Sequence, residues 1–350
     1  MGAEGERMTT ANPFTPANVL ARERQGLATM EAGKSYAKVR VVVRDFAVET
    51  ARSGRNAGKP YLSLTLADRT GQKDAKCWDG ASLAPHLAPG AVVELDRLTV
   101  DDWGPKFEAR DAHVVPPGGF DPKDFVPTLP LEVIEANWRL LQERLDALED
   151  PDLLKLRAAI FDRADVAEAY KNHPSGIYHH HNYMGGNVQH VLGLLRVVDA
   201  VCASYPEIDR DLVLVGATLH DLGKLREYGV DTMIRVTEEG RLRGHLVIGA
   251  EWLGQICSQL RHEGYDFPRG IENHLVHIIL SHHRKGEWGS PKPPATTEAM
   301  LVHLADYVDS QAKGFLQFTE EHRDEPEGWA RRWDGDSGQK EWVKTRPEWE

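Results

Sequence analysis

Apolar and polar residues alternate along the chain from about residue 35 to residue 116. The alternating segments are rich in β-branched residues, repeat with the period of two that a strand requires, and are separated by Gly, Pro, Asn and Asp. Five segments show this pattern: 35–51, 58–71, 72–80, 90–102 and 105–115. Short strands at this density are typical of a small closed sheet, so we predict a five-stranded OB-fold β-barrel over residues 35–116.

The period changes to that of an α-helix after residue 130. A segment rich in Pro and Gly, residues 116–130, ends the strand pattern and marks a domain boundary. Apolar residues then recur at helical spacing. The segments with this spacing are 131–148, 187–204, 210–225, 244–260, 271–283 and 296–315. We therefore predict a multidomain α and β protein whose second domain is an all-α helical bundle.

The predicted organisation has five parts. They are an N-terminal extension (1–34), the OB-fold domain (35–116), a linker with a connecting helix (117–150), the helical domain (151–318) and a charged, Trp-rich tail (319–350). One short helix is expected after Pro16. The tail carries Trp329, Trp333, Trp342 and Trp349 among ten acidic and six basic residues, and its role stays open between docking and disorder.

Composition narrows the class of protein. Hydrophobic residues make up 41% of the chain, and no apolar run approaches the roughly 18 residues of a membrane span. The N-terminus lacks a basic segment followed by an apolar core, so no secretory signal is expected. The three cysteines lie far apart and form no CxxC pair, which argues against disulfides and against a thiolate zinc site. We expect a cytoplasmic protein with no membrane partner.

A net charge of −12 disfavours a nucleic-acid partner, but the charge is unevenly distributed. Between residues 38 and 76 there are nine Lys and Arg and four Asp and Glu, a local excess of five positive charges. The first domain is therefore the part of the chain suited to phosphate binding.

Histidines suggest the chemistry of the second domain, since most of the 16 follow residue 172. Imidazoles and carboxylates occur in five of the predicted helices, which can bring them to one cavity. These residues are His190, His220, Asp221, His245, His282, His283 and Asp306. Neutral imidazole with carboxylate suits Mn, Fe, Co, Ni or Zn better than Mg or Ca, and seven donors exceed the needs of one ion. Any one of these histidines alone would more often be a hydrogen-bonded core residue.

The segment "HDLGK", residues 220–224, with His190 before it and Asp306 after it, resembles the HD-domain metal-dependent phosphohydrolases. Together with "HHNYMGGNVQH", "GRLRGHLVIGAEWL" and "HIILSHHRKGEWGSPKPPATTEAMLVHLADYVDS", it resembles the YhaM-type 3′-to-5′ exoribonucleases, which join an OB-fold to an HD domain. The resemblance covers about residues 36–315. The N-terminal extension and the Trp-rich tail lie outside it.

The resemblance implies a two-metal site. His190, His220, Asp221 and Asp306 would hold one ion, and His245, His282 and His283 would complete a second site with Asp221 bridging. Which of His282 and His283 faces the metal is open, because neighbours on a helix differ by about 100°. Mn²⁺ is the expected ion, with Co²⁺, Fe²⁺, Ni²⁺ and Zn²⁺ as alternatives. The ions would activate a water and hold the phosphate oxygens, while Asp221 and Lys224 would be the catalytic residues.

Other residues are candidates for binding nucleic acid. In the first domain they are the loop cations Arg52, Arg55 and Lys59 and the aromatic residues Tyr61 and Trp78, with Trp103 and Phe107 also considered. Aromatic residues on short strands are more often core residues than stacking platforms. In the second domain they are His181, from a cluster of three histidines, and Arg284, Lys285 and Trp288 in a Pro/Gly loop. That loop is otherwise a solvated connection.

Together with these features, the resemblance implies a metal-dependent 3′-to-5′ exonuclease of single-stranded RNA, with ssDNA as an additional substrate, that releases nucleoside 5′-monophosphates. The alternatives are an HD-type phosphohydrolase of small nucleotides and a non-catalytic single-strand-binding protein. Lys224 is also compatible with an ordinary surface lysine. A homo-oligomer is compatible with the sequence.

Overall fold

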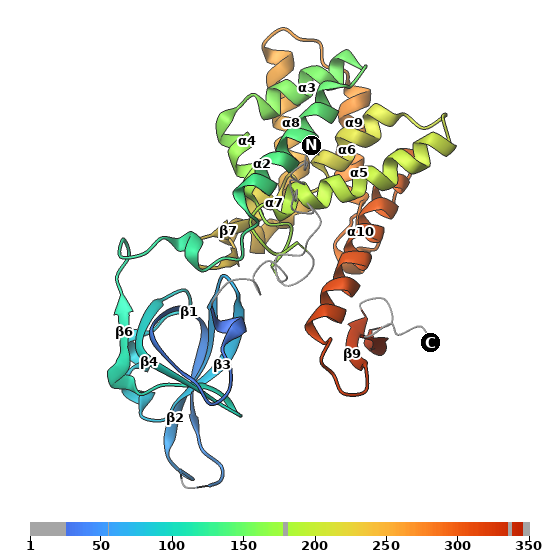
Figure 1. Cartoon of the computed structure of the whole chain (residues 1–350). Helices are drawn as coiled ribbons and strands as arrows, with labels where there is room; N and C mark the ends of the chain where they lie inside the picture. Colours follow the sequence, from blue (N-terminus) through green and yellow to red (C-terminus); the bar gives the residue numbers. More distant parts are fainter. Residues whose placement is uncertain (1–25, 55, 178–180, 335–337, 346–350) are drawn as a thin grey trace, which may run out of the picture. The chain divides into compact units, whose positions relative to one another are not determined.

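The computed structural model describes residues 26–54, 56–177, 181–334 and 338–345 (Figure 1). The chain forms two compact units. One contains the described residues up to Val133 together with Tyr228–Arg235, and the other contains Ile134–Glu227 and the described residues from Val236 onward. The division at Val133 falls inside the segment 117–150 predicted as linker and connecting helix. The short helix predicted after Pro16 lies outside the described residues.

The first unit is built on a six-stranded sheet that closes on itself. Its strands are β1 (Ser35–Thr50), β2 (Pro60–Asp68), β3 (Gly71–Cys77), β4 (Val92–Asp101), β5 (Gly104–Lys106) and β6 (Ala112–Val115). The order is β1-β2-β3-β5-β4-β6, and an additional β1–β4 pairing closes a ring of five strands. The register of β1 on β2 shifts between Val43 and Asp45, and a bulge of this kind bends a strand so that it can pair on both sides.

Alternation along these strands fills the ring with apolar side chains. The buried cluster includes Val41, Val43, Leu62, Leu64, Leu66, Ala75, Cys77, Val93, Leu95 and Phe107. Short 3-10 helices lie around the sheet: η1 (Leu27–Thr29), η2 (Gly80–Ser82), η3 (Ala84–His86), η4 (Ala109–Asp111) and η5 (Pro122–Asp124). The single strand predicted over 105–115 is split into β5 and β6 by η4, where the Ala109 N–H donates to Asp79 Oδ1 at 2.9 Å. The sheet therefore has six strands where five were predicted, and five of the six form the ring.

The second unit is a helical bundle. Its helices are α2 (Leu131–Asp146, which begins just before the division), α3 (Pro151–Phe161), α4 (Ala164–Asn172), α5 (Gly186–Ser204), α6 (Arg210–Leu219), α7 (Lys224–Glu227), α8 (Glu238–His262), α9 (Arg269–Ser281) and α10 (Thr297–Glu321). One continuous apolar cluster joins them. The side chains of Asp150, Asp209, Thr237 and Thr296 cap α3, α6, α8 and α10, each of which typically stabilises its helix by about 1 kcal/mol. A β-rich unit followed by a helical domain confirms the predicted fold class.

Two hairpins depart from the predicted all-α second half. Strands β7 (Tyr228–Val230) and β8 (Ile234–Val236) interrupt the helices, and residues 228–235 belong to the first unit, where Thr232 donates to the Gly90 carbonyl at 2.8 Å. In the tail, β9 (Trp329–Asp334) pairs antiparallel with β10 (Gln339–Lys344). The described part of the tail is therefore an ordered hairpin. None of the described helices combines the length and apolar character that a membrane span needs.

Candidate metal centre and substrate cavity

The seven predicted metal ligands lie together inside the helical unit. His190 belongs to α5, His220 and Asp221 directly follow α6, His245 lies in α8 after a kink at Gly244, His282 and His283 follow α9, and Asp306 belongs to α10. Donor atoms of these residues form sets that lie within 4.8 Å of one another. The sets are His190–His220–Asp221, His220–His282–Asp306 and His245–His282–His283.

Asp221 occupies the middle of this cluster, and its two oxygens face different histidines. Its Oδ2 lies 3.2 Å from Nε2 of His220 and 3.9 Å from Nε2 of His190. Its Oδ1 lies 3.7 Å from Nε2 of both His245 and His282. Nε2 of His190 also lies 3.3 Å from Asp306 Oδ1. Asp221 thus stands between two groups of imidazole nitrogens.

Four of the five predicted ligand histidines are held by a hydrogen bond through Nδ1. In these rings Nδ1 lies 2.7–2.8 Å from an oxygen, which selects the tautomer with the proton on Nδ1 and points Nε2 at the centre, while Nδ1 of His245 lies 3.0 Å from a carboxylate oxygen. The oxygens belong to Asp309 for His190, Ala217 for His220, Glu227 for His245, Ile279 for His282 and Trp288 for His283. The second layer is therefore two carboxylates and three main-chain carbonyls.

Three buried polar atoms of this cluster have no hydrogen-bond partner. They are Nε2 of His220, Nε2 of His245 and Oδ1 of Asp221. An unsatisfied buried polar atom costs about 1–3 kcal/mol, and a lone pair that faces a carboxylate oxygen is repelled by it. Divalent transition metals bind imidazole nitrogen and carboxylate oxygen together, so bound cations would satisfy these atoms at once. The residues present fit a metal centre.

Burial and charge pairing set the protonation states of these residues. Burial lowers the pKa of His282 and of His283, which keeps both rings neutral and able to bind metal. Burial also acts to lower the pKa of His190, but the carboxylates of Asp306 and Asp309 outweigh it and raise the pKa to about 10. Burial would raise the pKa of Asp221, yet the surrounding imidazoles and Lys224 hold it well below its usual range. The carboxylate at the centre stays ionised.

The turn after α6 explains how the HDLG segment places two ligands. Helix α6 ends at Leu219, where a continuous helix was predicted, and the Leu222 and Lys224 N–H groups donate to the carbonyls of Leu219 and Asp221. A Cβ atom on Gly223 would lie 2.0 Å from the carbonyl oxygen of His245. Glycine at this position therefore allows the backbone of α8, which carries His245, to approach Asp221.

His282 and His283 both take part in the cluster, although one of them was expected to face away. Helix α9 ends at Ser281, so the two residues lie at and beyond its C-terminal cap. Their rings pack edge to face with centroids 4.3 Å apart, and both belong to the group with His245. The 100° separation between neighbours on a helix does not apply to these two residues, because they lie past the end of α9. The structure gives no reason to exclude either histidine as a metal ligand.

Asp309 supports His190, and sequence reasoning missed it. Its Oδ2 lies 2.8 Å from Nδ1 of His190 and 3.0 Å from Nε2 of His181. Gly193 lies one helical turn after His190, and a Cβ there would come within 2.0 Å of Asp309 Oδ1. The available signal was its spacing, since Asp309 follows Asp306 by three residues and so shares its side of α10.

His181 is buried, which is at odds with the substrate contact predicted for it. Its side chain is held between Asp309 and the hydroxyl of Tyr183, and only 2% of the residue is exposed. Burial lowers its pKa to about 4 despite the Asp309 carboxylate. A neutral ring inside the protein cannot grip a phosphate at the surface. The geometry instead makes His181 a neighbour of the His190–Asp309 pair.

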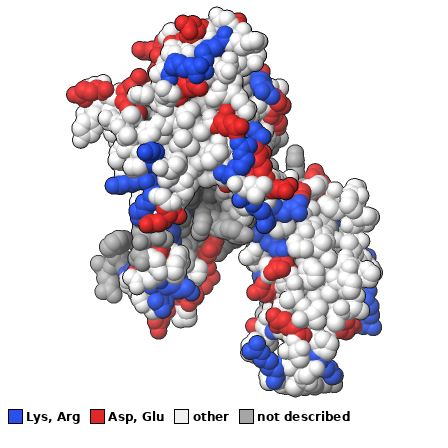
Figure 2. Space-filling model, turned by 180° about the vertical axis from the view of Figure 1, so that it is seen from behind, with Lys and Arg blue, Asp and Glu red and all other residues white. Residues whose placement is uncertain are grey.

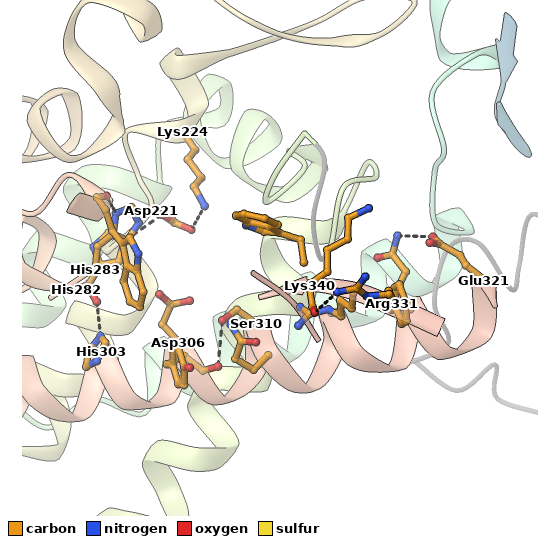
Figure 3. Close-up of a pocket in the computed structure, with 18 residues that line it drawn as sticks. Asp221, Lys224, His282, His283, His303, Asp306, Ser310, Glu321, Arg331 and Lys340 are labelled. Atoms are coloured by element: carbon orange, nitrogen blue, oxygen red, sulfur yellow. Dashed lines mark hydrogen bonds and ion pairs between the residues drawn. The ribbon is translucent and has the colours of Figure 1, made fainter. Parts of the chain in front are cut away.

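Lys224 lies against the candidate metal centre. Its Nζ is 2.7 Å from Asp221 Oδ2 and donates to the Ser175 carbonyl at 2.8 Å. Figure 3 shows this side chain pointing toward Asp221 from above the cavity. The lysine is mostly buried, which sets it apart from the surface lysine that was the alternative.

A cavity of about 730 Å³ opens beside the metal centre and follows α10 (Figure 3). At one end it is lined by Asp221, Lys224, His282, His283 and Asp306, and at the other by residues of α10 and of the C-terminal hairpin. Trp288 lines it and carries the Lys285 Nζ 4.1 Å from its ring centroid. Arg284 is exposed and has a positive φ of 67°, and it does not belong to the lining.

The first unit has a smaller hollow, of about 430 Å³, beside the candidate aromatic residues. Trp78 lines it and lies against Tyr61, with ring centroids 4.8 Å apart. Trp103, also in the lining, is 86% exposed. The lining further includes Lys76 and Lys106, which sequence reasoning had not singled out.

The remaining predicted binding residues of this unit differ in their surroundings. Arg52 and Lys59 are exposed on the loop between β1 and β2, whereas Arg55 lies outside the described residues. Phe107 is buried in the core of the ring. Over the face drawn in Figure 2, basic and acidic side chains are interspersed.

Comparison with known proteins agrees with this chemistry. Residues 187–311 match the HD domain family. The chain is 31% identical to the 3′-5′ exoribonuclease YhaM of Oceanobacillus iheyensis over 75% of its length and 81% of the relative's. It is 31% identical to YhaM of Halalkalibacterium halodurans (73% and 78% covered) and 32% identical to YhaM of Listeria innocua (72% and 79% covered). The chain therefore belongs to the family of YhaM 3′-5′ exoribonucleases and carries the HD domain of that family.

Proposed function

We propose that this protein is a metal-dependent 3′-5′ exonuclease that hydrolyses single-stranded RNA and releases nucleoside 5′-monophosphates. The observation that carries the proposal is the position of Asp221, whose oxygens stand between two groups of buried Nε2 atoms. Its relatives are named exoribonucleases, which gives the class of substrate. The proposal includes the preference for RNA over DNA, the 3′-to-5′ direction of digestion and the release of nucleoside 5′-monophosphates.

His190, His220 and Asp306 would hold one divalent ion, His245, His282 and His283 the other, and Asp221 would bridge them. Mn²⁺ suits this donor set, as do Co²⁺, Fe²⁺, Ni²⁺ and Zn²⁺. When bound, such ions supply an acidified water and neutralise the charge of a phosphodiester. Asp309 and Glu227 keep His190 and His245 in the tautomer that binding requires.

Lys224 would act on the phosphate itself. Its Nζ lies at the edge of the cavity, 2.7 Å from the bridging carboxylate, where the non-bridging oxygens of a bound phosphodiester would come. With Asp221 holding metal, the Lys224 ammonium group would be available to stabilise charge that develops on the phosphate. Trp288, with Lys285 against its ring, offers a face on which a terminal base can stack.

The first unit would bind the strand away from the point of cleavage. Trp78 and Trp103, with Lys76 and Lys106 in the same hollow, combine stacking faces with cations, which is the arrangement that single-strand-binding grooves use. Arg52 and Lys59 belong to the adjacent loop, and we propose that they and Arg55 add phosphate contacts, while Tyr61 supports Trp78. Because the whole chain is acidic, we expect modest affinity that falls steeply with salt. DNA single strands would bind the same surface.

The proposal is tested with an RNA oligomer labelled at its 5′ end, incubated with Mn²⁺ and sampled over time. We expect a ladder that shortens from the 3′ end and nucleoside 5′-monophosphates as the product. EDTA and the Asp221→Asn substitution should each abolish the ladder. Asp266→Asn is the matched control, because Asp266 is an exposed aspartate of the same unit, in the loop between α8 and α9.

Each other outcome selects a different function. Hydrolysis of small nucleotides with intact RNA would indicate a nucleotide phosphohydrolase. RNA that is bound but never shortened would indicate a single-strand-binding protein. Digestion that persists in EDTA would overturn the metal-dependent proposal, and the same assay with a DNA oligomer decides whether ssDNA is a substrate.

A further inference from the structure

The C-terminal hairpin of β9 and β10 sorts its residues onto two faces of opposite character. Residues directly opposite on antiparallel strands share a face, and alternate residues along a strand do as well. The pairings Trp329↔Lys344, Arg331↔Trp342 and Trp333↔Lys340 therefore make up one face. The pairings Ala330↔Val343, Arg332↔Glu341 and Asp334↔Gln339 make up the other.

The second face packs against the protein. Ala330 and Val343 are buried, and the Arg332 guanidinium lies 4.3 Å from the ring centroid of Phe315 on α10. Figure 1 shows β9 beside the end of α10, and both belong to the same compact unit. The hairpin is thereby attached through its Ala330 side.

The first face, which we call the Trp face, is left to solvent. It consists of Trp329, Arg331, Trp333, Lys340, Trp342 and Lys344, three tryptophans and three cations, with no carboxylate among its described residues. Trp333 and Trp342 are 60% and 61% exposed. Large aromatic side chains are rarely left exposed in such a group without a partner. Alternating aromatic and cationic residues are the pattern that binds single-stranded nucleic acid.

The Trp face also forms the far wall of the cavity that begins at the metal centre. Arg331, Trp333 and Lys340 line this cavity together with Asp221 and Asp306, and Figure 3 shows Arg331 and Lys340 beside α10, along the helix from Asp306. Asp306 and Glu321, both in the lining, are separated by 321 − 306 = 15 residues, or about 22 Å at about 1.5 Å per residue. At about 3.4 Å per stacked nucleotide this length corresponds to about six nucleotides.

We propose that the Trp face is a second strand-binding platform, which holds the RNA a few nucleotides upstream of the bond that is cleaved. Arg331 and Lys340 contact phosphates, and Trp333 stacks on a base. The inference rests on the proposed function for its substrate, but its residues lie outside the metal centre. It gives the tail, which lies outside the resemblance seen in the sequence, a role in binding long substrates.

The test compares a long and a short substrate in Trp333→Ala and Lys340→Gln variants of the full chain. Both side chains are exposed, so the fold should persist, which circular dichroism checks. For a 12-nucleotide RNA we expect KM to rise about fivefold or more in Trp333→Ala, since stacking on one aromatic residue is worth roughly that factor. The kcat for a dinucleotide should stay unchanged. Gln339→Ala, on the opposite face of the hairpin, is the matched control.

Salt dependence provides a second readout that needs no cleavage. In EDTA, the affinity for a fluorescein-labelled 12-nucleotide RNA is measured by anisotropy at several salt concentrations. Lys340→Gln should reduce the slope of log affinity against log salt by about 0.7, the value for one phosphate contact to a single strand.

The outcomes separate this inference from the proposed function. If the wild type digests RNA and the variants keep its KM and salt slope, the Trp face is not a platform. If the wild type binds RNA through this face but digests neither substrate, the proposed nuclease activity fails while the platform stands. A Trp333→Ala variant that changes only the sedimentation of the protein would identify the face as a contact between copies of the chain and overturn the inference.

Discussion

Asp309 contacts His190 on the side of the ring that faces away from the candidate metal centre. The distance between Oδ2 of Asp309 and Nδ1 of His190 is 2.8 Å. A carboxylate in this position fixes the ring and makes Nε2 a stronger ligand. We predict that Asp309→Asn weakens Mn²⁺ binding about 10–100-fold while the fold is kept. Isothermal titration calorimetry measures the affinity, with Asp266→Asn as the control. An unchanged affinity would show that Asp309 has no influence on the centre.

Gly223 tests the packing that brings two ligands together. A Cβ atom there would collide with the His245 carbonyl oxygen at 2.0 Å, and main-chain atoms of two packed segments cannot easily move apart. Overpacking of this kind typically costs about 1–3 kcal/mol, so we predict that Gly223→Ala lowers the free energy of unfolding by at least that amount and weakens Mn²⁺ binding.

Gly270→Ala is the matched control for Gly223→Ala. Gly270 lies in α9, and its Cβ would meet no atom within 4 Å. Because alanine favours a helix over glycine, this variant should be neutral or more stable by about 0.5–1 kcal/mol. Chemical denaturation distinguishes the two variants, and equal stabilities would contradict the packing argument.

Metal binding should depend on pH through His190. The pKa of this imidazole is raised to about 10 in the ion-free protein, above the 6.5 of an ordinary histidine. Without bound metal, the ion pair of His190 with Asp306 and Asp309 therefore contributes its full stabilisation below pH 6.5. This contribution is lost as the pH rises through about 10. At neutral pH a cation must displace one proton from Nε2, so Mn²⁺ affinity should rise about tenfold per pH unit between pH 7 and 8. Calorimetry in buffers of different ionisation enthalpy counts the released proton, and a flat profile would contradict this assignment.

Two buried cysteines can report separately on the two units. Burial raises the pKa of Cys257 in α8 to about 12, and burial with the Asp79 carboxylate does the same for Cys77 in β3. Neither thiol should react with iodoacetamide near pH 8 until its unit unfolds. Mn²⁺ at about 100 times its dissociation constant should slow labelling of Cys257 about 100-fold, because binding stabilises the helical unit by about 2.7 kcal/mol. Mass spectrometry of the labelled peptides measures the labelling rate. An equal rate for Cys257 with and without Mn²⁺ would contradict a metal site in the helical unit.

Much of the fold follows from periodicity, because a period of two and a helical period separate the two units along the chain. The ring of strands departs from prediction where Ala109 turns back to Asp79, a contact 30 residues apart that no local pattern reveals. The hairpin of the tail was equally hidden. In the sequence, the alternating tryptophans and cations of the tail look like a charged, irregular segment. The two strands become evident only from the pairing of Ala330 with Val343 in the structure.

The seven clustered residues could be picked out because imidazole beside carboxylate is rare in apolar helices, and the structure brings their donor atoms together. Two neighbouring carboxylates were missed, because the spacing of Asp309 after Asp306 is a weak signal and Glu227 belongs to a different helix from His245, which it contacts. His181 shows the opposite error. Its place in a polar cluster suggested exposure, whereas the Tyr183 hydroxyl and Asp309 hold it inside the protein.

Anomalous diffraction from crystals grown with Mn²⁺ tests the central claim most directly. We predict two anomalous peaks, one among the Nε2 atoms of His190 and His220 and a carboxylate oxygen of Asp306, the other among those of His245, His282 and His283. One carboxylate oxygen of Asp221 should lie within bonding distance of the first peak, and the other oxygen within bonding distance of the second. Peaks located away from Asp221, or none at saturating Mn²⁺, would contradict the account.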